Sequence, residues 1–375
     1  MGLFNLKKTK KTIEPDLKTE EKQGDISSNV IFDQKNILVI GGAGFIGSNL
    51  IERLLEKNKV VCIDNFITGK SENIEQALQF PNFTLIKHDM GQKIDLESLN
   101  ELKKFRIKWQ GIQDIIYMAC PTSYKDYNKY AIETIDANSV ALKNALELAV
   151  KYKTRFLFGS SSAIYGNAED VQDKVKETYI GKTDHLGPRS AYNEGKKFGE
   201  MMVKNYHEKY KLDISIARIF ATYGPRMILN DGRLIPDFIE NAMQNKNLII
   251  PGNENSITSL CYIEDMVDGI LKLMDTPIYD PVNLGGDEKI KIKDMAEKII
   301  ELTHSKSKIV FEDKFKYFQR KLIADISKAK ESLGWIPMIK LENGLQKTIK
   351  HVQREKAGLN PSKINPSPFS KKVSG

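Results

Sequence analysis

The turn at residues 41–47 restricts the possible folds of this chain more than any other feature of the sequence. It follows the short apolar run 37–40, whose β-branched content is typical of a buried parallel strand. After it, apolar residues recur at helical spacing from Phe45 to Leu55. The turn itself reads Gly41, Gly42, Ala43, Gly44, Phe45, Ile46, Gly47. A strand, a glycine-rich turn and a helix start in this order place a pyrophosphate at the helix N-terminus. The sequence therefore predicts a doubly wound parallel sheet, a Rossmann fold, that binds a dinucleotide.

The second predicted strand, residues 60–63, identifies the dinucleotide. It ends in Asp64, 17 residues after Gly47. A carboxylate at this place accepts hydrogen bonds from both hydroxyls of the adenosine ribose and repels a 2′-phosphate. The pattern favours NAD over NADP. The alternative is that Asp64 only caps its loop.

Tyr192 and Lys196 add chemistry to the cofactor site. They are four residues apart and share one face of a predicted helix. A cation beside a phenol favours the phenolate, so this tyrosine can pass a proton near neutral pH. A helical Tyr–Lys pair is common on ordinary surfaces. Combined with the glycine turn upstream, it predicts a catalytic pair.

The middle of the chain alternates strands and helices, as a doubly wound sheet requires. Further strands are predicted at 83–87, 114–118, 155–159, 214–219 and 282–284, and helices at 131–152, 192–209, 234–244, 263–274 and 292–302. Ligands in such sheets bind beyond the carboxyl ends of the strands. We expect an NAD-binding domain at 34–225, with the strand near 282–284 returning to it. A smaller C-terminal α/β substrate lobe is expected at 226–350.

Composition agrees with a soluble enzyme subunit. The chain has 375 residues, 41% of them hydrophobic and 28% charged, and no apolar stretch is long enough to span a membrane. Its cysteines, Cys62, Cys120 and Cys261, lack metal-ligand spacing, which predicts reduced thiols in a cytoplasmic protein and no metal site.

The net charge is +8, and much of the excess is in the terminal segments. Residues 1–33 are interpreted as a flexible basic extension and 351–375 as a flexible tail. A basic arm can touch nucleic acid or an anionic membrane surface. A solvated extension is the simpler interpretation, so neither a nucleic-acid partner nor membrane insertion is expected.

Several motifs together resemble the extended short-chain dehydrogenase/reductases that modify nucleotide sugars, over residues 36–345. The similarity is strongest to the UDP-glucuronate decarboxylase (UDP-xylose synthase) subfamily. It rests on the segments 64–70, 119–121, 187–190, 194–196, 217–220 and 222–227. The resemblance implies a Rossmann lobe for NAD, a second lobe for a nucleoside-diphosphate sugar, and a homodimer formed by the helices 131–152 and 192–209.

The resemblance also implies roles for individual residues. Tyr192 takes the proton of a sugar hydroxyl, usually at C4, and Lys196 lowers the pKa of the tyrosine and holds the nicotinamide ribose. Ser161 bridges the sugar and the tyrosine. The remaining cofactor residues are Gly41, Gly44, Phe45, Ile46, Gly47, Asp64, Asn65, Gly69, Asp89, Met90, Ala119 and Asn138, and the expected substrate residues are Pro121, Ser162, Arg226, Arg233 and Arg320.

The departures from the decarboxylase pattern are as informative as the matches. Where the decarboxylases carry a Glu after the strand, this chain has Ala163, and their later Arg is replaced by Thr258. A methyl group and a neutral hydroxyl cannot replace the charges that handle the proton and the carboxylate. Ala221 and Pro251 replace an Asn and an aromatic residue that meet the nucleotide.

Three functions stay open. The favoured one is an NAD-dependent oxidoreductase or epimerase acting by hydride transfer at C4 of a nucleotide sugar. The second is a glucuronate decarboxylase that has moved its acid and its arginine, for instance to Glu194 and Arg226. The third is a non-catalytic NAD-binding protein, although such proteins generally lose the Tyr or the Lys that this chain retains.

Overall fold

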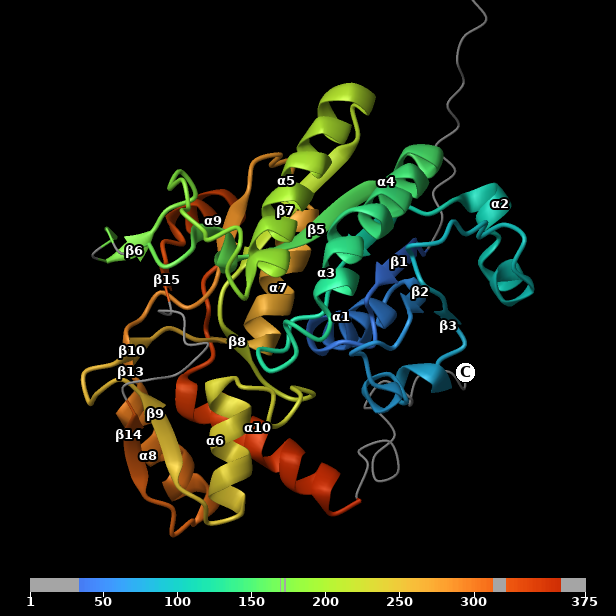
Figure 1. The fold of residues 1–375 in the computed structure, drawn as a ribbon. Coiled ribbons are helices and arrows are strands. Elements are labelled where there is room, and N and C mark those ends of the chain that lie inside the picture. Colours follow the sequence, from blue (N-terminus) through green and yellow to red (C-terminus); the bar gives the residue numbers. More distant parts are fainter. Residues whose placement is uncertain (1–33, 169, 172, 313–321, 359–375) are drawn as a thin grey trace, which may run out of the picture. The chain divides into compact units, whose positions relative to one another are not determined.

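The computed structural model describes residues 34–168, 170–171, 173–312 and 322–358. Its centre is a seven-stranded parallel sheet in the order β12-β7-β5-β4-β1-β2-β3 (Figure 1). The strands are β1 Asn36–Ile40, β2 Lys59–Asp64, β3 Phe83–Lys87, β4 Asp114–Tyr117, β5 Arg155–Ser161, β7 Asp213–Ile219 and β12 Val282–Leu284. The predicted Rossmann fold is confirmed, including the returning strand at 282–284.

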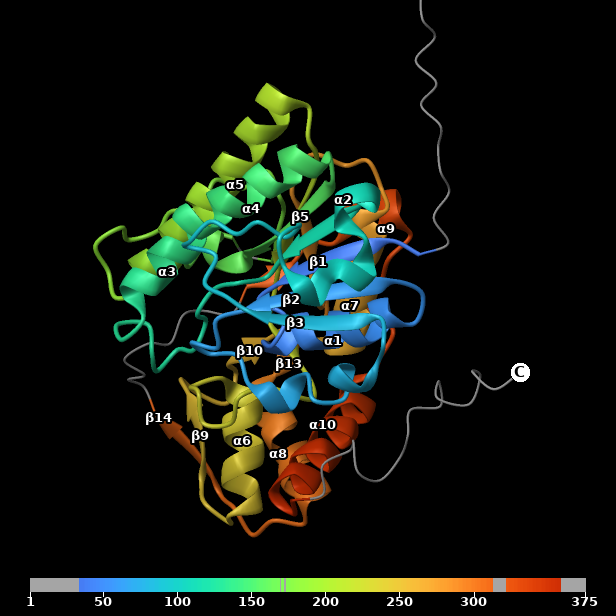
Figure 2. The ribbon, with the colours of Figure 1, turned by 90° about the vertical axis from the view of Figure 1, so that its right-hand side faces the viewer.

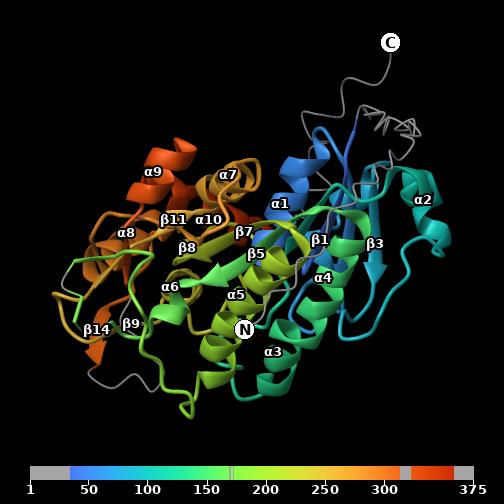
Figure 3. The same cartoon turned by 90° about the horizontal axis from the view of Figure 1, so that it is seen from above.

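Side chains of the central strands alternate between two cores, as the period of two requires. In β1, Ile37 and Val39 join one core and Leu38 and Ile40 join the other. Helices α1 Phe45–Leu55, α7 Ile263–Met274 and α9 Ser327–Leu333 cover the first face of the sheet. Helices α4 Val140–Tyr152 and α5 Ser190–Tyr210 cover the second, where α3 Ala131–Asn138 packs beside α5. The two layers are separated by the sheet in the view from above (Figure 3).

Smaller elements, most of them from the C-terminal part of the chain, lie beside the sheet, and several of them appear in the lower half of Figure 1. The two-stranded pairs are β6 Lys174–Val175 with β15 Ile323–Ala324, β8 Thr222–Tyr223 with β11 Cys261–Tyr262, β9 Leu248–Pro251 with β14 Ile309–Glu312, and β10 Ile257–Thr258 with β13 Ile290–Lys291. The remaining helices are α2 Ile107–Gln110, α6 Leu234–Met243, α8 Ile292–Thr303 and α10 Leu341–Lys356.

Two predicted boundaries are corrected. The single helix expected at 131–152 is two helices, α3 and α4, separated at Ser139, whose backbone is not helical. Asn138 explains the break, because its side-chain amide donates to the carbonyl of Thr134 at 2.8 Å and competes with the backbone ladder. Helix α10 also continues to Lys356, into the segment predicted as a tail. The other calls on 1–33 and 359–375 lie outside the described residues.

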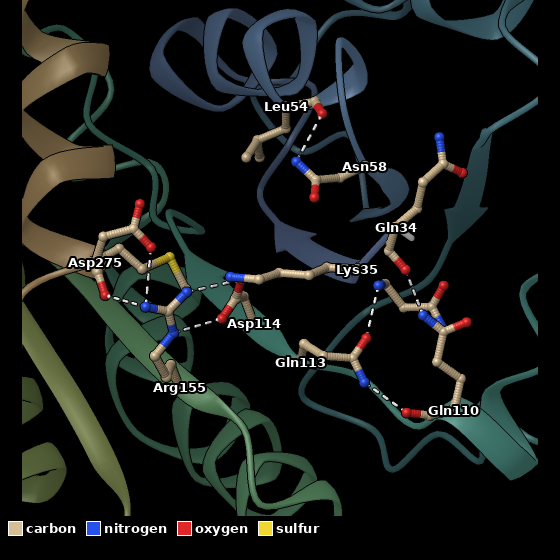
Figure 4. A network of polar contacts seen from close by, with 11 residues as sticks. Gln34, Lys35, Leu54, Asn58, Gln110, Gln113, Asp114, Arg155 and Asp275 are labelled. Atoms are coloured by element: carbon tan, nitrogen blue, oxygen red, sulfur yellow. Dashed lines mark hydrogen bonds and ion pairs between the residues drawn. The ribbon is translucent and has the colours of Figure 1, made fainter. Parts of the chain in front are cut away.

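A polar network closes the amino-terminal edge of the sheet (Figure 4). Asp114, the first residue of β4, is almost completely buried and accepts two hydrogen bonds from Arg155, the first residue of β5. Lys35 reaches the same carboxylate at 3.2 Å. Arg155 also donates to the carbonyl of Met274 at the end of α7 and pairs with Asp275 at 3.0 Å. The network ties the strand starts to a helix C-terminus, where a cation is favourable.

Candidate active site

The glycine turn lies at the opposite, carboxyl-terminal edge of the sheet. Gly41 has a φ of +81°, and a β-carbon there would lie 2.5 Å from the backbone nitrogen of Ala119. A β-carbon on Gly47 would lie 2.3 Å from the carbonyl oxygen of Gly41. Helix α1 starts at Phe45, directly after Gly44. The turn is therefore tight enough to bring a phosphate close to the helix N-terminus, where N–H groups lack helical partners.

Asp64 ends β2 and is buried against the turn. One carboxylate oxygen accepts from the backbone N–H of Ala43 and the other from that of Phe66, both at 2.8 Å. Burial raises the pKa of this carboxyl group. A carboxylate has about four acceptor sites, so two loop contacts are compatible with a ribose. Asp64 therefore holds its loop, which was the alternative interpretation of this residue. Its position beside the glycine turn is also compatible with binding the adenosine ribose.

A cavity of about 160 Å³ continues from Asp64 along the sheet edge. Five more of the predicted cofactor residues line it: Asn65, Gly69, Asp89, Met90 and Ala119. Pro121, which was expected to meet the substrate, also lines this cavity. Gly69 packs closely, because a β-carbon there would come within 2.8 Å of the Asp64 carboxylate. Residues and shape fit a dinucleotide.

Ser161, Tyr192 and Lys196 meet in a second cavity of about 260 Å³, which shares Gly41 and Gly44 with the first. Ser161 is the last residue of β5, and the other two lie in the first turns of α5. The Ser161 hydroxyl is close enough to the Tyr192 phenol to lower its pKa. The ammonium group of Lys196 donates to the carbonyl of Gly159 at 2.8 Å and lies 5.9 Å from the centre of the Tyr192 ring.

The electrostatics of this group differ from the prediction. Burial raises the pKa of Tyr192 to about 12, and the groups that act against this rise are the Ser161 hydroxyl and the Arg189 guanidinium. Lys196 was expected to lower it, but burial lowers the pKa of Lys196 itself. The Glu200 carboxylate acts against this shift, but the loss of hydration of the buried ammonium group outweighs it. Both groups are thus perturbed by desolvation, as is common at functional sites.

Asn138 supports the catalytic helix from behind. Its amide also lies 3.2 Å from the sulfur of Cys120. A β-carbon on Gly195 would lie 3.1 Å from the same amide, so α3 and α5 touch at this point. The residue therefore stands next to the helix that carries Tyr192 and Lys196, and its role as a cofactor residue stays a prediction.

The predicted substrate residues separate into groups. Ser162 and Arg233 line the cavity that holds Tyr192. Arg226 instead lines a different cavity and pairs with Glu52, because the turn after Gly224 directs it toward α1. Glu194 pairs with Lys197 at 3.8 Å and bonds Thr183, and it does not line the cavity. Neither Arg226 nor Glu194 is placed to act as a relocated charge. Arg320 lies outside the described residues.

Sequence reasoning missed an aromatic and cationic cluster beside Tyr192. The rings of Tyr127 and Tyr192 are 5.9 Å apart, and Tyr124 stacks on Tyr127 at 5.5 Å. Arg189 lies over both Tyr124 and Tyr127 and donates to the Tyr127 hydroxyl at 3.0 Å. Tyr124 and Tyr127 lie in the loop that follows β4, and Arg189 belongs to the motif just before Tyr192. Their positions along the chain were the available signal.

Fold and site together define an extended short-chain dehydrogenase/reductase, an enzyme class that acts on nucleotide sugars. More narrowly, the chain belongs to the family described as GDP-mannose 4,6 dehydratase, which matches residues 38–348. UDP-glucuronic acid decarboxylase 3 of Arabidopsis thaliana is 37% identical over 321 residues, covering 84% of this chain and 89% of the relative. UDP-glucuronic acid decarboxylase 1 of Danio rerio is 36% identical, over 86% of this chain and 74% of the relative.

Solved structures agree in fold. UDP-glucose 4-epimerase of Thermotoga maritima, in complex with UDP-glucose, superposes with a TM-score of 0.74 at 26% identity and covers 86% of this chain and 99% of its own. UDP-glucuronic acid 4-epimerase of Bacillus cereus, in complex with UDP-glucuronic acid and NAD, gives 0.74 at 27% identity, over 85% and 99%. The curated relatives favour the decarboxylase alternative over the epimerase that the sequence analysis preferred. Within the described residues, no helix is both long and apolar enough to cross a membrane.

Proposed function

We propose that this protein oxidises the C4 hydroxyl of a UDP-hexuronate with NAD. The main support is that Ser161, Tyr192 and Lys196 line one cavity, and that residues of the glycine turn line the same cavity. Both the similar decarboxylases and the similar 4-epimerase are named for UDP-glucuronic acid. A secondary hydroxyl beside a positioned phenol is the shared requirement of both activities.

The chain's own residues then have distinct tasks. Ser161 orients the sugar hydroxyl and Tyr192 accepts its proton, because both side chains line the same cavity and Ser161 lowers the pKa of the Tyr192 phenol. Lys196 holds the ribose next to the nicotinamide, while Asp64, Gly41 and Gly47 hold the adenosine and pyrophosphate half. When bound, NAD supplies the hydride acceptor and a positive charge that favours ionisation of a phenol as deeply buried as Tyr192.

Two outcomes of this oxidation compete. Return of the hydride to the other face of C4 gives the epimer. Loss of carbon dioxide from the 4-keto acid leaves the electron pair of the broken C5–C6 bond in an enolate, which is protonated at C5 to give a 4-keto pentose. Return of the hydride from NADH to C4 then gives the pentose and regenerates NAD. The relatives favour this second candidate, at 37% identity. Ala163 and Thr258 remain the reasons to expect the first.

A product assay separates the candidates. Purified protein is incubated with NAD and UDP-glucuronate, and the nucleotide sugars are resolved by anion-exchange chromatography. UDP-xylose identifies the decarboxylase and UDP-galacturonate identifies the epimerase. If the substrate is recovered unchanged while UDP-glucose or another neutral sugar nucleotide turns over, the hexuronate assignment is wrong. If no sugar nucleotide is turned over, the non-catalytic alternative is supported instead.

The homodimer belongs to the same proposal. Large apolar side chains are exposed on three neighbouring helices, α3, α4 and α5, which lie side by side in Figure 2: Ile132, Ile135, Val140, Phe198 and Met201. A contiguous apolar face of this kind is typical of a protein interface. A second copy that pairs α4 and α5 with their equivalents would cover it. Sedimentation equilibrium of the protein and of the variant Phe198→Glu tests this; a monomeric parent protein would contradict it.

A further inference from the structure

A largely buried ion pair joins the catalytic helix α5 to strand β7. Glu200 belongs to α5 and Arg218 to β7, and both side chains are mostly shielded from solvent. Arg218 donates to both oxygens of the Glu200 carboxylate, from its Nε at 3.0 Å and from its Nη2 at 2.8 Å. A two-pronged contact of this kind fixes the orientation of the carboxylate as well as its position.

The same carboxylate is tied to the end of β5. The hydroxyl of Ser160 donates to it at 2.5 Å, and Ser160 immediately precedes Ser161 in the chain. Helix α5 packs closely on this strand, because a β-carbon on Gly199 would lie 2.4 Å from the ring of Phe158. Glu200 is therefore held from β5 and from β7, next to the strand end that carries Ser161.

Lys196 lies one helical turn before Glu200. The two residues are four positions apart in α5, so their side chains share one face of the helix. Loss of hydration lowers the pKa of Lys196, while negative charge on Cys120 or on Glu200 raises it. A cysteine carries that charge only after it loses its thiol proton, whereas Glu200 is already a carboxylate in its pair with Arg218. Glu200 therefore supplies the standing negative charge near Lys196.

Glu200 does not need to touch the ammonium group of Lys196 to act on it. Arg218 and Ser160 already bind the carboxylate, and the described hydrogen bond of Lys196 goes to the carbonyl of Gly159 at 2.8 Å. An ammonium group has three donors, and a carboxylate in direct contact would compete with a ribose hydroxyl for them. A fixed charge one turn away stabilises the ammonium form and leaves its donors to the cofactor.

We infer that Glu200 is a positioning residue that keeps Lys196 in its ammonium form, in which it can hold the nicotinamide ribose. The inference rests on the proposed C4 oxidation and adds the group that maintains the charge of its lysine. The alternative is a purely structural role, in which Glu200 only joins α5 to β7. The two roles differ in one measurable respect, because only the first links the pH dependence of NAD binding to Glu200.

The affinity for NAD as a function of pH tests the inference. NAD-free full-length protein is titrated with NAD by calorimetry between about pH 6 and pH 10, a range that suits a lysine whose pKa is lowered by burial. All proteins carry Cys120→Ala, so that this thiol does not titrate beside Lys196. Glu200→Gln removes the charge and keeps the shape. Glu194→Gln is the matched control, since it makes the same change on the same helix at a half-buried residue that does not line the cavity.

Glu200→Gln should lose affinity for NAD at a pH about one unit lower than the parent does. The sign follows from the chemistry of an amine: the ammonium form exists below the pKa of Lys196, and without its counter-charge the lysine gives up its proton earlier as the pH rises. Glu200→Asp keeps the charge and should move back toward the parent. Glu194→Gln should follow the parent at every pH. Lys196→Met should bind NAD weakly and without this pH dependence.

Glu200→Gln leaves Arg218 without its buried carboxylate, which can prevent folding. In that case Glu200→Gln combined with Arg218→Met makes the comparison, because it removes both charges, and the same shift is expected.

Two results would overturn the inference and leave the proposed oxidation to the product assay. The first is a pH dependence in Glu200→Gln that equals that of the parent, including an affinity weakened by one factor at every pH, which would make Glu200 structural. The second is a pH dependence that persists in Lys196→Met, which would assign it to another group. If the parent protein binds no NAD, the inference and the proposed function fall together.

Discussion

The two edges of the central sheet treat buried charge in opposite ways. At the amino-terminal edge, Asp114 is matched by Arg155 and Lys35 within 3.2 Å (Figure 4). At the carboxyl-terminal edge, Lys196 is equally buried but has the carbonyl of Gly159 as its described hydrogen-bond partner. Burial there raises the pKa of Tyr192 and lowers that of Lys196.

This difference in how buried charges are paired indicates that the amino-terminal edge has a structural role and the carboxyl-terminal edge a chemical one. A matched buried pair fixes strand ends, and breaking it leaves an uncompensated charge. Unmatched groups are costly in the free protein and become useful when a ligand supplies the missing partner. Substitutions at the amino-terminal edge should therefore change the free energy of unfolding, and substitutions at the carboxyl-terminal edge should change binding or turnover.

Lys196→Met should give the largest effect. It removes the cation that we propose holds the nicotinamide ribose, so turnover should fall by about two orders of magnitude or more and NAD should bind more weakly. Thermal stability without cofactor should stay close to that of the parent, because a poorly solvated charge is replaced by an apolar chain. Calorimetric melting and NAD titration measure both. A large loss of stability would make Lys196 structural, like Asp114.

Tyr192→Phe removes one oxygen atom. Turnover should again fall by about two orders of magnitude or more, the range for losing a positioned acid–base group. NAD affinity should be retained, which distinguishes this variant from Lys196→Met. Steady-state kinetics and cofactor titration on the same preparation are the measurement. Full activity in this variant would contradict the catalytic assignment.

Asp114→Asn tests the opposite edge. It keeps the side-chain shape and leaves Arg155 without its buried counter-charge, so the unfolding free energy should drop by roughly 2 to 3 kcal/mol. Chemical denaturation measures the drop. At a temperature where the variant is folded, its kcat should match that of the parent. Reduced kcat with unchanged stability would erase the distinction between the edges.

Asp64→Asn should give the smallest of these effects, a change in cofactor preference of about tenfold. The amide removes the charge that repels a 2′-phosphate, while its oxygen can still accept one of the loop hydrogen bonds. Titration with NAD and NADP, before and after the substitution, gives the ratio. If the parent protein already prefers NADP, the argument from this carboxylate is wrong.

The fold could be predicted because its signals are local. The glycine turn and the alternation of apolar strands with amphipathic helices were enough for the sheet and for α1 and α7. The division of 131–152 into α3 and α4 was missed because it depends on how one side chain, Asn138, bonds its own helix.

For the site, residues that share a motif or end a strand, such as Ser161, Tyr192 and Lys196, could be brought together from sequence. The position of Arg226 could not be predicted, since it depends on the direction of one side chain, which pairs with Glu52 of α1 and lines a different cavity. The groups that lower the pKa of Tyr192, Ser161 and Arg189, were also missed, because the helical spacing pointed to Lys196. Which groups act on the phenol depends on how the buried side chains pack, and the spacing of residues along a helix does not reveal this.

The most direct test of the central claim follows the hydrogen on C4. UDP-glucuronate carrying deuterium at C4 is turned over by the NAD-loaded protein, and the product is analysed by mass spectrometry and NMR. Oxidation at C4 with return of the same hydride predicts a primary isotope effect on turnover and deuterium retained at C4 of the product. If rapid quenching of a single turnover never finds deuterium in the bound nicotinamide, and no isotope effect appears in that single turnover, the reaction occurs elsewhere on the sugar and the account is contradicted.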